Sequence, residues 1–115
     1  MLLATAARDA MPQSEEDLPE FVRRISTIFE QEMEPHFQEE ERHALPRLRE
    51  LGRADLADRT FSEHQYMRGL IAQMLAHPSS QLIRDFSKAM QGHVEFEEGE
   101  VWEVLESAME AAKEV

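Results

Sequence analysis

The chain has 115 residues with 24 acidic and 12 basic side chains, and its formal net charge is −12 at pH 7. This length predicts one domain, and the negative charge argues against binding to nucleic acid or to anionic membranes. No apolar segment approaches the roughly 18 residues of a membrane span, and cysteine is absent, so we expect a cytoplasmic protein without a cleaved signal peptide.

The first strong helix signal follows an N-terminal arm. Residues 1–16 carry weak helical periodicity, which predicts a remnant first helix or a frayed arm. Asp17 can cap a helix, and Pro19 suits its first turn. A long helix is therefore expected from about Leu18 to Leu51, with Gly52 as its C-terminal stop.

Two further helices are expected to complete residues 17–115 as one helical domain. The second runs from about Ala54 to Ala76, just before a proline. Either Ser79 or Ser80 can cap the third, which reaches about Lys113. Short connections between long helices predict an all-α, up-and-down antiparallel helical bundle.

The motif H-x-x-x-E-E occurs twice, beginning at His36 and, 57 residues later, at His93. Residues four apart share a helix face, so each copy directs an imidazole and a carboxylate the same way. The offset continues into flanking apolar residues, which indicates an internal repeat of a helix pair. A weak helix former, Pro35 or Gly92, directly precedes each histidine. A kink or bulge beside a site would explain this recurrence, and coincidence is the alternative.

Five polar residues fall on the apolar stripes of the expected helices: His36, Glu40, His64, His93 and Glu97. Each alone has a structural explanation, such as a satisfied core histidine or a glutamate that reaches solvent. Together they would be costly, because one unpaired buried carboxylate costs several kcal/mol and a whole domain has about 5–15 kcal/mol of net stability. A metal site is therefore favoured over an accidental polar seam. Without cysteine its donors are nitrogen and oxygen, which suit iron, manganese or zinc.

Both copies of the motif resemble the hemerythrin-like family, also called the HHE cation-binding domain. The resemblance covers about residues 18–110 and implies a four-helix bundle, with a short or degenerate first helix, that holds a non-haem di-iron centre. The residues implied are Glu40 and Glu97 as bridging carboxylates and His36, His64 and His93 as terminal ligands. Glu98, five residues after His93, is an alternative to Glu97.

The chain departs from the family pattern at two positions. The repeat calls for a counterpart of His64 near position 7, but that residue is Ala7 and no histidine precedes His36. One turn after His64, where oxygen carriers of the family have a second histidine, the chain has Arg68. These departures argue against reversible oxygen carriage and against a complete site in an isolated monomer.

Two hypotheses from different classes follow. The first is an iron-binding protein, with metal ions and dioxygen as partners, used in iron or oxygen sensing, binding or storage. The second is a metal-free helical interaction or dimerisation module whose site has decayed. A carboxylate-bridged oxidase is weaker, because ferritin-like proteins use Glu-x-x-His and the order here is reversed. No pattern assigns catalytic residues or an enzymatic activity. Three long helices leave an apolar groove, so a second copy could form a homodimer and donate a ligand.

Overall fold

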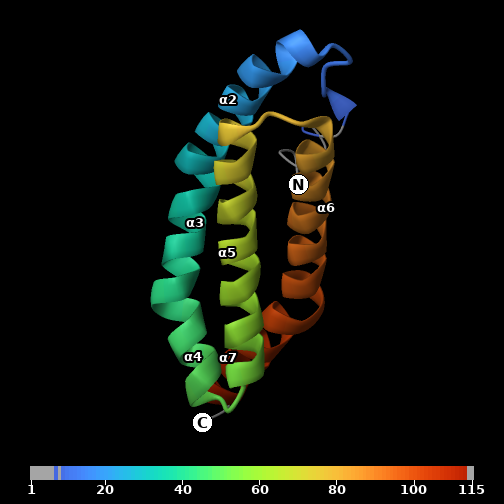
Figure 1. Ribbon diagram of the computed structural model, residues 1–115. Helices are drawn as coiled ribbons and strands as arrows, with labels where there is room; N and C mark the ends of the chain where they lie inside the picture. Colours follow the sequence, from blue (N-terminus) through green and yellow to red (C-terminus); the bar gives the residue numbers. More distant parts are fainter. Residues whose placement is uncertain (1–6, 8, 114–115) are drawn as a thin grey trace.

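The computed structural model describes residue 7 and residues 9–113, and helices are the regular structure in that part of the chain (Figure 1). Its three long helical rods, formed by residues 18–50, 54–76 and 80–113, alternate in direction. The middle rod contacts both others, and the molecule is elongated, with extents of 59 × 22 × 21 Å. The prediction of an all-α antiparallel bundle is therefore confirmed.

Two of the rods contain changes of helical type. The first rod is preceded by a single 3-10 turn, η1 (Glu15–Asp17), and consists of α2 (Leu18–Ile28), η2 (Phe29–Met33), α3 (Glu34–Glu39), η3 (Glu40–Ala44) and α4 (Leu45–Glu50). The middle rod is the uninterrupted helix α5 (Ala54–Ala76). The third consists of α6 (Ser80–Phe96), η4 (Glu97–Val101) and α7 (Trp102–Lys113). The segments η2, η3 and η4 are π-helical.

Most helix ends lie where turn and capping residues predict them. The first rod stops before Gly52, the bounds of α5 are as expected, and the Ser79 hydroxyl caps α6 by accepting from the backbone N–H of Leu82 at 3.3 Å. Asp17 occupies the N-cap position of α2, as expected, but its side chain makes no capping hydrogen bond. Helical structure starts one turn earlier, where Ser14 caps η1.

Gly52 ends the first rod with a left-handed backbone, at φ +79°, a conformation that costs other L-residues about 1–2 kcal/mol. Gly52→Ala is expected to lower the free energy of unfolding by that amount. The loss would come from the backbone conformation alone, because the added methyl group would meet no atom within 4 Å. Gly69→Ala is the matched control, because Gly69 lies inside α5 with equally open space. It should raise stability by up to about 1 kcal/mol. Urea denaturation measures both, and a loss of equal size in both variants would contradict the backbone explanation.

The π segments η3 and η4 repeat together with the sequence motif, whereas η2 has no counterpart, because residues 86–90 belong to regular α6. In each, one backbone N–H bonds five residues back instead of four, which adds a residue to the turn and rotates the helix that follows. The segment η3 begins at Glu40, whose carbonyl accepts from Leu45, and η4 begins at Glu97, whose carbonyl accepts from Trp102. Equivalent residues also meet in space, because the rings of Phe29 and Phe86 pack edge to face with centroids 5.8 Å apart. The 57-residue repeat is therefore a repeat of structure.

The local causes of the π segments differ between the two halves. Pro35 and Pro46 each lie two residues after a π segment, and a proline both lacks an N–H and clashes with the carbonyl four residues earlier. A wider turn upstream relieves that clash. Gly99 lies inside η4. Gly92, by contrast, lies within regular α6, which favours coincidence as the explanation for this residue.

The hydrophobic core has two parts, and polar residues lie between them. Along α5, Ala57 belongs to one part and Met67 to the other, with buried His64 between them. The upper part consists of Ala7, Leu18, Val22, Ile25, Phe29, Phe37, Met67, Leu70, Ile71, Met74, Ile83, Phe86 and Met90. The lower part consists of Leu45, Leu48, Leu56, Ala57, Phe96 and Val101. The alternation places a polar layer across all three rods.

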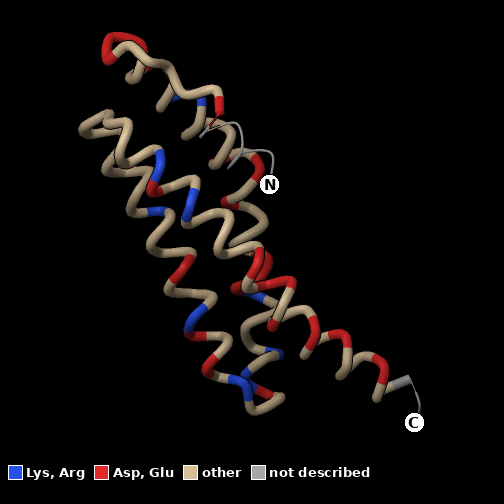
Figure 2. Tube along the Cα trace, turned by 90° about the vertical axis from the view of Figure 1, so that its right-hand side faces the viewer, with Lys and Arg blue, Asp and Glu red and all other residues tan. Residues whose placement is uncertain are grey.

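The N-terminal arm is described only in part. Within it, Ala7 is helical and fully buried in the upper core, while the expectations for residues 1–6 and 8 lie outside the described residues. At the opposite end, α7 begins against the lower core, its C-terminal part extends away from the other helices, and acidic residues lie along it (Figure 2). No helix among the described residues is long and apolar enough to cross a membrane.

Candidate metal centre

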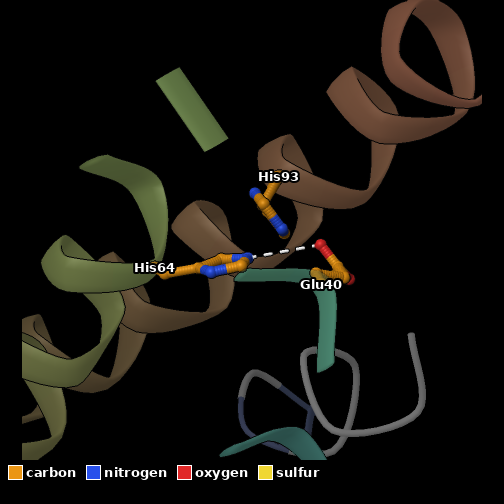
Figure 3. Close-up of side chains that lie close together, drawn as sticks. All are labelled: Glu40, His64 and His93. Atoms are coloured by element: carbon orange, nitrogen blue, oxygen red, sulfur yellow. Dashed lines mark ion pairs between the residues drawn. The ribbon is translucent and has the colours of Figure 1, made fainter. Parts of the chain in front are cut away.

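Three buried side chains from three helices converge in the polar layer (Figure 3). They are Glu40 of η3, His64 of α5 and His93 of α6, whose exposed fractions are 6%, 0% and 1%. His64 Nε2 lies 3.5 Å from Glu40 Oε2, and one donor atom from each residue lies within 4.8 Å of the other two. We call this group the inner position. Its two imidazoles and one carboxylate can hold a metal ion.

A second group shares one residue with the first. One donor atom each from His36, Glu40 and Glu97 also lie within 4.8 Å of one another, and we call this group the outer position. His36 Nε2 contacts Glu40 Oε1, and the histidine side chain is 50% exposed. Because Glu40 belongs to both groups, its carboxylate stands where it could bridge two cations.

The polar atoms of this layer are poorly satisfied without a cation. Within the described part of the chain, four buried atoms lack a well-formed hydrogen bond: Glu40 Oε1, His64 Nε2, His93 Nε2 and Glu97 Oε2. Three of them have an ion-pair contact instead: His93 Nε2 lies 2.8 Å from Glu97 Oε1, His64 Nε2 lies 3.5 Å from Glu40 Oε2, and Glu40 Oε1 contacts His36 Nε2. Buried polar atoms are nearly always bonded, and each unbonded one costs about 1–3 kcal/mol. Lone pairs of imidazole and carboxylate are the ligands that divalent iron, manganese and zinc accept, so the donor set fits such an ion.

His64 is oriented by a chain of charged groups. Its Nδ1 donates to Glu41 Oε2 at 2.6 Å, and Arg68 donates to both oxygens of that carboxylate at 2.8 and 3.2 Å. Arg68 also binds both oxygens of Glu34 at 2.9 Å. Although burial opposes ionisation, the Arg68 hydrogen bonds lower the pKa of Glu41. An ionised Glu41 fixes the proton of His64 on Nδ1, which leaves Nε2 free to face the inner position.

His93 is oriented in the same manner from the other side. Its Nδ1 donates to Glu63 Oε1 at 2.7 Å, and Arg59 donates to the second oxygen of Glu63 at 2.9 Å. Burial lowers the pKa of His93, but the interactions with the Glu97 and Glu63 carboxylates outweigh it and raise that pKa overall. We refer to Glu41 and Glu63 as the anchor carboxylates, because each holds one imidazole with Nε2 directed at the centre.

The pKa values of Glu40 and Glu97 are shifted in opposite directions. Burial raises the pKa of Glu40, and the neighbouring Glu97 raises it further. Burial also opposes ionisation of Glu97, but the interactions with His93 and with the Glu40 carboxyl group lower its pKa overall. Two carboxyl groups this close cannot both be ionised cheaply. A divalent cation between them would take the place of the shared proton.

The structure brings together all five residues that the sequence singled out. Glu97 is buried whereas Glu98 is exposed, so the geometry favours Glu97 over its alternative. His36 lies at the solvent edge instead of on a fully buried face, because the turn of η2 just before it rotates α3. Whether these residues bind a metal stays a prediction.

Sequence reasoning did not assign roles to the anchor carboxylates. Glu41 is the last residue of the first motif copy, so the motif itself could have identified it as a candidate. Glu63 offered no comparable signal, because it directly precedes His64 but anchors His93 on another helix. Arg68 occupies the position where the family pattern of oxygen carriers calls for a second histidine, and its guanidinium holds Glu41.

The fold and the donor groups define an all-α bundle with a cluster of histidines and glutamates suited to binding a cation. The family model of the hemerythrin HHE cation binding domain matches residues 1–105. The chain therefore belongs to the hemerythrin HHE cation-binding family. Comparison with curated proteins and with solved structures gave no match. The matched region includes residues 1–16, and their separation from a domain at 17–115 stays a prediction.

Proposed function

We propose that this protein binds a pair of metal ions, with iron as the first candidate and manganese or zinc as alternatives. The bridging ligands would be Glu40 and Glu97, and the terminal ligands His36, His64 and His93. The main support is the convergence of buried imidazole nitrogens and carboxylate oxygens from three helices, and four of these atoms lack a well-formed hydrogen bond. The protein would act in iron or oxygen sensing, binding or storage.

The residues of this chain would hold and tune the ions. Glu41 and Glu63 keep the Nε2 atoms of His64 and His93 aimed inward, and the two core parts above and below keep bulk water from the inner position. Iron bound there would supply redox and oxygen chemistry, while the protein sets ligand geometry and access. The five ligands leave coordination positions for water or a small exogenous ligand.

Metal content per chain tests the proposal directly. The purified protein, loaded anaerobically with Fe²⁺ and freed of excess metal, is expected to retain up to two iron ions per chain. Its visible absorption spectrum should change on exposure to air, as expected for iron held by nitrogen and oxygen ligands. Iron content near zero after loading would contradict the proposal and favour a metal-free interaction module.

Thermal stability gives an independent prediction. Ligands that bind only the folded state stabilise it by about 2.7 kcal/mol when their free concentration is 100 times Kd, which corresponds to a rise in Tm on the order of 10 °C in a domain of this size. Excess Zn²⁺ or Mn²⁺ should therefore raise the Tm of the wild-type chain, and EDTA should reverse the rise. In the His93→Ala variant the rise should be largely lost. A metal-free module predicts the same Tm with metal and with EDTA.

A further inference from the structure

We propose that the two cation positions are not equivalent: the inner position retains its ion, whereas the outer position exchanges its ion with solvent. This inference rests on the proposed metal binding and adds to it a division of labour between two sites. Three independent features of the structure carry it, namely burial, the orientation of the imidazoles and the symmetry of the repeat.

The first difference between the two positions is their burial. All three residues of the inner position are almost completely buried, whereas the outer position includes the half-exposed side chain of His36. A surface hollow between α5 and α6 is lined by Glu63 and His93. However, Nε2 of His93 is itself buried, and the Nδ1 side of the ring is occupied by Glu63. Water therefore has a shorter path to an outer ion than to an inner one.

The second difference between the two positions is how firmly their imidazole rings are held in orientation. Both inner histidines have Nδ1 bonded to an anchor carboxylate, and each anchor is itself bonded to an arginine. Among the residues that the structure describes, the His36 ring has one carboxylate contact, through Nε2 to Glu40. Loss of an anchoring group of this kind typically reduces metal affinity 10- to 100-fold. The inner position is thus pre-organised, and the outer one is not.

The repeat supplies the third argument. Its offset pairs His93 with His36 and Glu97 with Glu40, and the rings of Phe29 and Phe86 meet across it. By the same offset the counterpart of His64 is residue 7, which is Ala7, an apolar residue buried in the upper core. The outer position therefore has one imidazole where the inner position has two.

Such a centre has a functional consequence. The inner ion would stay with the fold and neutralise its buried carboxylates. Occupancy of the outer position would follow the free metal concentration, because one of its three ligands, His36, is half exposed and has no anchor carboxylate. The protein would then respond to metal availability with one ion while the other keeps the site assembled.

Release of Co²⁺ tests the inference. The full chain is loaded with Co²⁺, freed of excess metal and mixed with EDTA, and release is followed by visible absorption and by metal analysis. We expect two phases of about one ion each, with the first at least about tenfold faster, in line with the cost of a lost anchor. The His36→Ala variant should lose the fast phase and keep the slow one. Its matched control is His43→Ala, because His43 is exposed on the same rod and belongs to neither position; both phases should remain.

A second variant tests the anchoring argument. Glu41→Gln should speed the slow phase about 10- to 100-fold and leave the fast phase unchanged, with circular dichroism confirming that the helices are intact. Release of both ions in one phase, or loss of the slow phase in His36→Ala, would overturn the inference while leaving metal binding in place. A wild-type chain that takes up no Co²⁺, Fe²⁺ or Zn²⁺ would overturn the proposed function and this inference together.

Discussion

Replacing Glu40 with glutamine is expected to remove both metal ions. Glu40 is the residue common to the two candidate groups, so its substitution takes one carboxylate oxygen from each at the same time. Glutamine has nearly the same shape but carries no charge, and its amide nitrogen cannot act as a ligand. Metal analysis should give close to zero ions per chain under conditions that load the wild-type protein.

The same variant should behave differently without metal. Burial raises the pKa of Glu40, which shows that its ionised form is poorly accommodated when no cation is present. Denaturation in EDTA should therefore find Glu40→Gln as stable as the wild-type chain, or more stable by about 1 kcal/mol, as replacements of buried charges often are.

The neighbouring residue offers a matched control. Glu39 is the glutamate that precedes Glu40 on the same rod. Its side chain is 64% exposed, and it belongs to neither group. Glu39→Gln should keep full metal content and near-normal stability, because exposed ion pairs contribute little. Full metal content in Glu40→Gln would show that Glu40 is not a shared ligand.

The helices were predictable because their ends depend on local chemistry. Gly52 stops the first rod, and Ser79 caps the third, through interactions within one turn of the backbone. The pairing of His36 with Glu40 and of His93 with Glu97 was predictable for the same reason, since residues four apart on a helix are neighbours.

The features that the sequence did not predict depend on how the helices are rotated against each other. Each π segment shifts the face that the following helix presents, and a count at 3.6 residues per turn does not include that shift. Phe37 is fully buried, although it follows His36, which had been placed on the buried stripe. Contacts between helices, such as Glu63 with His93, depend on that rotation, so no spacing along one helix could reveal them.

Phe37 shows how the core and the candidate site depend on each other. Its ring stacks on the His64 imidazole with centroids 3.9 Å apart and planes inclined by 8°. It also meets the edge of Phe29 at 5.6 Å and of His93 at 5.6 Å. One apolar side chain thus closes the upper core and forms a wall of the inner position.

Phe37→Ala is expected to be the most destabilising of the substitutions considered. Truncation of a fully buried phenylalanine costs about 3–5 kcal/mol, a large share of the roughly 5–15 kcal/mol that stabilises a domain. Urea denaturation in EDTA measures this loss. Phe61→Ala is the matched control, because Phe61 lies on α5 with 43% of its surface exposed, and it should cost less than about 1 kcal/mol.

The effect of Phe37 on metal binding can be separated from its effect on folding. Phe37→Leu keeps most of the buried volume, so the variant should fold with a loss of roughly 1–2 kcal/mol. It removes the flat face against which His64 is held, so the imidazole gains freedom that metal binding must then restrict. In the Co²⁺ release experiment its slow phase should become faster while its amplitude stays near one ion. An unchanged slow rate would mean that Glu41 alone orients His64, and the stacked ring would then serve only the core.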